Sequence, residues 1–119
     1  MAINGKQKGK RGELELKNEL NKYGYNTRRG QQYCGNNGDA DVVGLSGIHI
    51  ECKRVEKLNI NNAMKQAEND AKIDTLPVVF SKKSREPWLA TMKLEDWMKL
   101  YKSYRKDDNG TKEKNDEKE

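Results

Sequence analysis

Apolar and polar residues follow one another along this chain at spacings that predict helices and strands in a mixed order. Leu16, Leu20 and Tyr23 recur at intervals of four and three residues, which predicts an amphipathic helix over residues 10–23. Short segments bounded by Gly, Asn, Ser or Pro are typical of strands. Five such segments are predicted as strands: residues 25–28, 40–45, 48–54, 77–81 and 88–92.

Two further helices are predicted in the second half of the chain. In residues 60–73 a stripe that includes Ala63 and Ala67 is small enough for the helix to pack closely on a sheet. A last helix over residues 94–105 carries the stripe Leu94, Trp97, Met98 and Tyr101. Because the middle helix crosses over between two strands, the order predicts an α/β (α+β) fold, a mixed sheet with helices on both faces.

The composition predicts one small domain with a thin core. Of 119 residues, 33% are hydrophobic and 36% charged, so burial between two copies of the chain would help stability. Residues 1–8 are polar and are expected to be flexible, residues 9–105 are expected to form the domain, and residues 106–119 have almost no apolar side chain and are expected to be disordered.

The charge pattern favours a polyanionic partner. The net charge is +5, and the tail 106–119 holds four Lys against six Asp and Glu, so the basic charge belongs to the rest of the chain. No apolar run is long enough to span a membrane, and the first residues lack the apolar segment of a signal peptide. Cys34 and Cys52 are therefore expected to be free thiols of a cytoplasmic protein. Two cysteines and the single His49, without CxxC spacing, are a poor match for a zinc site.

Candidate chemistry lies in the hairpin of residues 40–54. Asp41 is on its first strand, and Glu51 and Lys53 share one face of its second strand. Paired carboxylates bind hard divalent cations, and a lysine beside them can orient water or stabilise charge on a phosphate. Glu13 precedes Leu16 by three residues and extends the apolar stripe of the first helix towards the same region.

Two features leave this interpretation open. Charged residues alternating on a strand, such as Glu51 and Lys53, are ordinarily a solvent-facing ladder of ion pairs. A two-residue turn at Ser46-Gly47 would also place Asp41 on the face of Cys52, away from Glu51. The metal-site interpretation therefore requires an odd-numbered turn or a bulge, because a shift of one residue reverses the face.

The motifs resemble those of the PD-(D/E)XK nucleases, and within them the archaeal-type Holliday junction resolvases and their phage-encoded relatives. The resemblance spans residues 8–104. It is carried by Lys8-Gly9…Glu13-Leu14-Glu15-Leu16, Asp39-Ala40-Asp41-Val42-Val43-Gly44 and Ile50-Glu51-Cys52-Lys53. The family usually has Pro where this chain has Ala40, which leaves Asp39 as a rival for Asp41. The resemblance implies a restriction-endonuclease-like mixed sheet flanked by helices.

The resemblance also implies roles for individual residues. Asp41 and Glu51 would bind one or two Mg²⁺ ions, for which Mn²⁺ would substitute, with the Cys52 carbonyl as a backbone ligand. Lys53 would position the attacking water or stabilise the phosphate. Glu13 would complete the metal site, directly or through water. A supporting role is predicted for Gln66, whose ordinary alternative is an exposed helix glutamine.

The remaining candidates are DNA contacts or core residues. The candidate DNA contacts are Lys8, Lys10, Arg11, Arg28, Arg29, Tyr33, Lys82, Lys83 and Arg85. Phe80, Trp88, Trp97 and Cys52 are expected in the core. Cys34 is expected to be an idle loop thiol. His49 is expected to have a structural role, with an approach to DNA or metal as its alternative.

The function predicted from the sequence is that of a Mg²⁺-dependent, homodimeric DNA endonuclease of a phage or prophage. Such a hydrolase would resolve four-way junctions in recombination and repair by paired symmetric nicks, each leaving a 5′-phosphate. Three alternatives stay open: a nuclease of the same fold with another DNA substrate, of the restriction, nicking or repair kind; a non-catalytic DNA-binding module; and a basic adaptor protein.

Overall fold

A computed structural model describes residues 5–30 and 40–106, with side chains from residue 9 onward. The elements are α1 (Gly5–Asn21), β1 (Arg28–Arg29), β2 (Val42–Val43), β3 (Ile48–Arg54), α2 (Ile60–Asp70), β4 (Leu76–Lys82), β5 (Leu89–Thr91) and α3 (Leu94–Lys106). Among these described residues no helix is both long and apolar enough to cross a membrane.

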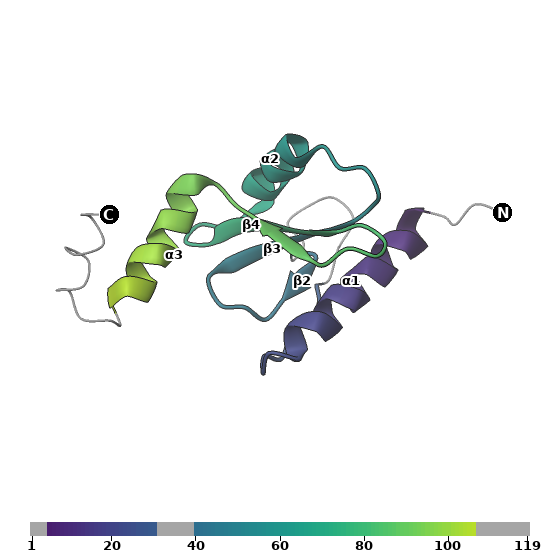
Figure 1. Cartoon of the computed structure of the whole chain (residues 1–119), viewed down its shortest axis with the longest axis horizontal. Coiled ribbons are helices and arrows are strands. Elements are labelled where there is room, and N and C mark those ends of the chain that lie inside the picture. The colour runs from purple at the N-terminus through teal and green to yellow at the C-terminus, as the bar shows by residue number, and fades with distance from the viewer. Residues whose placement is uncertain (1–4, 31–39, 107–119) are drawn as a thin grey trace.

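The five strands form one mixed sheet in the order β1-β2-β3-β4-β5. β3 and β4 are parallel, and the other neighbouring pairs are antiparallel. α2 is the crossover between the parallel strands, and α1 and α2 lie on opposite sides of the sheet (Figure 1). The predicted mixed sheet with helices on both faces is thus confirmed.

Each face of the sheet has its own core cluster. Below α1, Leu16, Val42 and Ile50 are buried, and Phe80 and Trp88 pack against them as predicted. Below α2, the small stripe of the helix covers the sheet, with Ala63, Met64, Ala67 and Val79 buried. Because strand side chains alternate, the odd-numbered residues of β3 share the face covered by α2.

The turn between β2 and β3 has the odd length that the metal-site interpretation requires. Val42 is paired with Ile50, so residues 45–47 form a three-residue turn, in which the Ile48 N–H donates to the Leu45 carbonyl at 3.1 Å. Gly47 has φ +82°, a conformation that glycine adopts without strain. Gly44 has φ +125°, and a Cβ there would lie 2.7 Å from the Thr27 Cα.

Several element boundaries differ from the prediction. α1 begins at Gly5, so residues 5–8, which were expected to be flexible, are helical; their Lys and Gln residues are good helix formers. β1 and β2 have only two residues each, because pairing between them is limited to Arg28 with Val43 and Arg29 with Val42. Residues 1–4 and the tail 107–119 lie outside the described residues.

The prediction that Trp97 is a core residue is wrong. α3 lies at one end of the molecule, beyond the sheet (Figure 1). Its Trp97 is 47% exposed and its Leu94 72% exposed. The apolar stripe is present as predicted, but α1 and α2 already cover the two faces of the sheet. α3 is therefore left with an exposed apolar side.

The close contact of α1 with β3 gives a test of the packing. A Cβ on Gly12 would lie 2.6 Å from the Arg54 Cβ, whereas a Cβ on Gly9 would meet nothing within 4 Å. Gly9→Ala should stabilise the protein by up to about 1 kcal/mol through helix propensity. Gly12→Ala should instead destabilise it by roughly 1–3 kcal/mol, because the helix must move away from the strand. Urea denaturation measures both, and a gain in stability for Gly12→Ala would contradict the packing.

Candidate active site

Asp41 is held against β3 by its backbone and by its side chain. The Asp41 N–H donates to the Ile50 carbonyl at 3.1 Å, and the carboxylate Oδ2 accepts the Cys52 N–H at 2.8 Å. At the end of β2 the Asp41 carboxylate therefore accepts a hydrogen bond from β3 in the place of a backbone carbonyl. This places Asp41 beside Glu51, as the metal-site interpretation requires. The rival Asp39 lies outside the described residues.

Glu51 is buried between two basic side chains of its own strand. It is only 3% exposed on the α2 side of the sheet, so the alternative of a solvent-facing ladder does not apply to it. Its Oε2 lies 3.9 Å from the Lys53 Nζ and its Oε1 lies 3.6 Å from the His49 Nε2. His49 is 7% exposed, and among the described residues its Nε2 finds no hydrogen-bond partner.

Lys53 is tied to α2 through Gln66. The Lys53 Nζ donates to the Gln66 Oε1 at 2.9 Å. Gln66 is thus in contact with the predicted catalytic lysine, at the position where a supporting residue was expected. The contact holds the amine between Gln66 and the Glu51 carboxylate.

Negative charge accumulates around Asp41. Burial, followed by the neighbouring Glu51 carboxylate, raises the pKa of Asp41 to about 7; Glu13 adds to this, while the Cys52 N–H and Lys53 oppose it. Burial, followed by Asp41, Glu13 and Glu51, raises the pKa of the Cys52 thiol to about 12. Cys52 is therefore a neutral thiol, packed against the core cluster below α1 as predicted.

Glu13 reaches this region from α1, where it is bound to Arg29. The Arg29 Nε lies 2.9 Å from the Glu13 Oε1, and both side chains are partly buried. Arg29, a predicted DNA contact, lies in β1 with this carboxylate partner, and its contact with DNA stays a prediction. Spacing along the chain does not predict this pair, because its partners are 16 residues apart and belong to different elements.

The comparisons with known proteins bear on the fold that carries these residues. No protein-family model and no curated protein sequence matches the chain. A solved structure does match: Hjc, a Holliday junction resolvase from the archaeal hyperthermophile Archaeoglobus fulgidus. The TM-score is 0.53 and the sequence identity 26%, over 71% of this chain and 72% of that chain. The chain has a resolvase-like nuclease fold.

The residues of this candidate site fit a hard divalent cation. Within the part of the chain that the structure describes, no three His, Cys, Asp or Glu side chains are grouped to hold a metal. Mg²⁺, however, is usually held by one or two carboxylates together with water and substrate phosphate. Asp41 and Glu51 supply such a pair, and the raised pKa of Asp41 reflects crowded negative charge that a cation would relieve.

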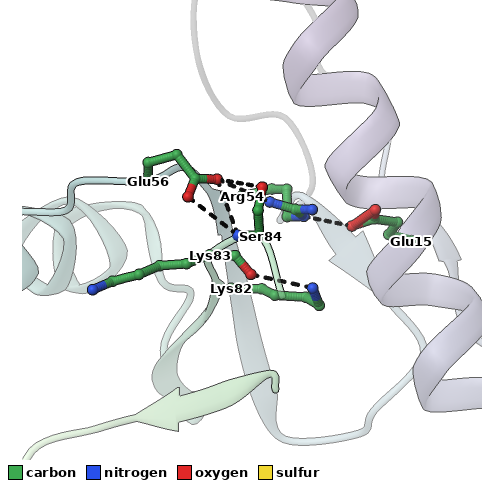
Figure 2. Close-up of polar contacts among 6 residues, drawn as sticks. All are labelled: Glu15, Arg54, Glu56, Lys82, Lys83 and Ser84. Carbon is green, nitrogen blue, oxygen red and sulfur yellow. Dashed lines mark hydrogen bonds and ion pairs between the residues drawn. The ribbon is translucent and has the colours of Figure 1, made fainter. Parts of the chain in front are cut away.

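The predicted DNA contacts are distributed over α1, β1 and the turn that follows β4. Lys10, Arg11, Arg28, Lys83 and Arg85 are exposed, and Lys82 is partly buried with its Nζ donating to the Lys83 carbonyl. The side chain of Lys8 and all of Tyr33 and Cys34 lie outside the described residues. The sequence also missed a network in which Arg54 contacts both Glu15 and Glu56 (Figure 2).

The raised pKa of Asp41 predicts that the free energy of unfolding of the metal-free protein decreases as the pH rises. The pKa is about 7 when folded, against an ordinary value of 3.8. The stability contributed by the protonated carboxyl is present below about pH 4 and is lost as the pH rises through about 7. Asp41→Asn should therefore become more stable than the wild type over this interval, by roughly 1–3 kcal/mol at pH 8.

Urea denaturation in EDTA from pH 4 to pH 8 measures this difference. The matched control is Asp70→Asn, at an exposed carboxyl of α2. If both variants gain the same free energy of unfolding as the pH rises, the effect does not come from the Asp41 site.

Proposed function

We propose that this protein is a Mg²⁺-dependent DNA endonuclease that resolves four-way junctions. The observation that carries the proposal is the grouping of Asp41, Glu51 and Lys53 on one side of a hairpin within a resolvase-like nuclease fold. The similarity to a Holliday junction resolvase supports the choice of substrate. The excess of basic residues outside the tail supports a polyanionic partner.

In this proposal the two carboxylates and the lysine divide the work of phosphodiester hydrolysis. Asp41 and Glu51, with the Cys52 carbonyl, would hold Mg²⁺ or Mn²⁺. When bound, the ion supplies an activated water and neutralises charge on the phosphate. Lys53, held by Gln66, orients the water or stabilises the negative charge that develops on the phosphoryl oxygens. The in-line attack breaks the bond to the 3′ oxygen and leaves a 5′-phosphate.

Glu13 and the exposed basic residues act around this centre. Glu13 completes the metal site directly or through a bound water, and its ion pair with Arg29 fixes its orientation. Lys10, Arg11, Lys83 and Arg85 contact backbone phosphates. Binding through such contacts should weaken steeply as the salt concentration rises.

Cleavage of a labelled four-way junction and of a linear duplex with the same sequence tests the proposal. With Mg²⁺ the wild type should make paired symmetric nicks in the junction, and EDTA should abolish them. Glu51→Gln and Lys53→Ala should each lower the rate by roughly 100-fold or more, because a ligand or a charge-stabilising group is lost. Lys57→Ala, at an exposed lysine in the segment after β3, is the matched control.

Each other result selects a different function. Equal cleavage of the duplex would support a nuclease that has no preference for junctions. Tight binding without cleavage in Mg²⁺ or Mn²⁺ would favour a DNA-binding module. Neither binding nor cleavage would favour an adaptor protein.

Symmetric cleavage requires two sites, and α3 is the proposed surface that brings two copies of the chain together. A two-fold dimer presents two identical sites to the two strands of a junction. The exposed apolar side chains of α3 are Leu94, Trp97, Met98, Leu100, Tyr101 and Tyr104. The rings of Trp97 and Tyr101 are stacked with their centroids 5.3 Å apart, so they form a continuous apolar surface. Exposed patches of this kind mark interfaces.

Replacing Trp97 and Tyr101 together by Asp should therefore convert a dimer into a monomer. Light scattering should give twice the chain mass of 13.7 kDa for the wild type and the single mass for the variant. The monomer should nick junctions on one strand at a time. Tyr23→Asp, at a tyrosine in the turn after α1 that is 72% exposed, is the control and should remain dimeric. A dimeric α3 variant would point instead to β5, an edge strand of the sheet.

A further inference from the structure

A pocket of about 210 Å³ lies at the carboxyl ends of the parallel strands β3 and β4. Its walls include Val55 and Leu58 on one side and Ser81 and Leu89 on the other. Ser81 is the register partner of Lys53 in the neighbouring strand. The pocket therefore begins one strand away from the proposed catalytic lysine.

The two segments that form the pocket are tied to each other. The Glu56 carboxylate accepts hydrogen bonds from the Ser84 N–H at 3.0 Å and from the Ser84 Oγ at 2.7 Å (Figure 2). Arg54 lies 3.5 Å from the same carboxylate and 2.7 Å from Glu15 on α1. These contacts hold the segment after β3 and the turn after β4 in place, so the pocket is formed before any ligand arrives.

The lining combines apolar side chains with a charged rim of two lysines and one glutamate. Val55, Leu58, Pro87 and Leu89 offer apolar contact, and Lys82, Lys83 and Glu86 also line the pocket. In Figure 2 the Lys83 side chain extends away from the Glu56–Ser84 contacts. Among the described residues its amine has no ion-pair partner. A ligand with an apolar face attached to negatively charged groups matches this arrangement, and a nucleobase with its flanking phosphates is such a ligand.

We propose that this pocket, called here the base pocket, receives an unstacked nucleobase of the cleaved strand next to the scissile phosphate. This inference rests on the proposed nuclease function and gives that function a source of selectivity. Unstacking costs a few kcal/mol in a regular duplex and least where a base is already unpaired or poorly stacked. A branch point supplies such a base. The base pocket thus favours branched DNA over linear duplex without reading its sequence.

Fluorescence of 2-aminopurine tests the base pocket directly. The fluorophore is placed in turn at the nucleotides on either side of the mapped cleavage site of a four-way junction. The junction is bound, in Mg²⁺, by Glu51→Gln protein. At one position the fluorescence should rise several-fold on binding, because the base leaves the stack.

Two pocket variants and one control variant test whether the fluorescence rise and the junction preference depend on the base pocket. Val55→Trp fills the pocket, and Leu89→Asn removes an apolar wall at a residue that is 61% exposed. In the Glu51→Gln background both should abolish the rise. With Glu51 intact, both should lower the junction-over-duplex cleavage ratio about tenfold, an apolar-contact loss of about 1.4 kcal/mol. Ile73→Asn, at an isoleucine 90% exposed, should change neither. Thermal melting checks that all variants fold.

The outcomes distinguish the base pocket from the nuclease function. Junction cleavage by the wild type, with no fluorescence rise at any flanking position, would overturn the base pocket and keep the nuclease. A rise that persists in both pocket variants would place the base elsewhere and also overturn it. If the wild type neither binds nor cleaves DNA, the proposed function and the base pocket fall together.

Discussion

The length of one turn decides which side of the sheet Asp41 occupies. Residues 45–47 make a three-residue turn, so Val42 faces Ile50 and Asp41 lies beside Glu51. With a two-residue turn, Asp41 would point into the core cluster below α1, and Glu51 would be buried without a second carboxylate. Gly44 and Gly47, both with positive φ, give the chain the backbone freedom to make this turn. The site therefore depends on backbone geometry before it depends on any charged side chain.

Placing the carboxylates of Asp41 and Glu51 together under α2 disfavours their ionised forms, and neighbouring groups offset this effect only in part. The Cys52 N–H and Lys53 stabilise ionised Asp41, but burial and Glu51 outweigh them and leave its pKa near 7. A buried charge is stable only when it is paired or bound to a metal. Ionisation of both carboxylates in the metal-free site is thus unfavourable at neutral pH. Binding a divalent cation would favour the ionised forms, which ties metal binding to the stability of the fold.

The periodic spacing of apolar residues along the chain predicted the helices and strands and the face that each one turns to the sheet or the core. The alternation in β3 predicted that Glu51 and Lys53 share one face, and the small stripe of α2 predicted that this helix packs closely on the sheet. Spacing did not predict contacts between distant segments, such as Arg29 with Glu13, because each depends on how the elements are arranged in space. It also misplaced Trp97: an amphipathic stripe shows that a helix has an apolar side, but not whether this chain or another covers it.

The parallel pairing of β3 and β4 explains why the proposed catalytic lysine and the base pocket lie next to each other. Parallel strands end at the same edge of a sheet, so Lys53 and Ser81 are level with each other and the segments that follow both strands meet there. The first segment carries Glu56 and the second carries Ser84, and their hydrogen bonds join the two. The proposed catalytic side chains lie on or beside the strands, while the connections set the shape of the adjoining surface. Under the proposed function, changes in those connections would alter which DNA is bound without moving Asp41 or Glu51.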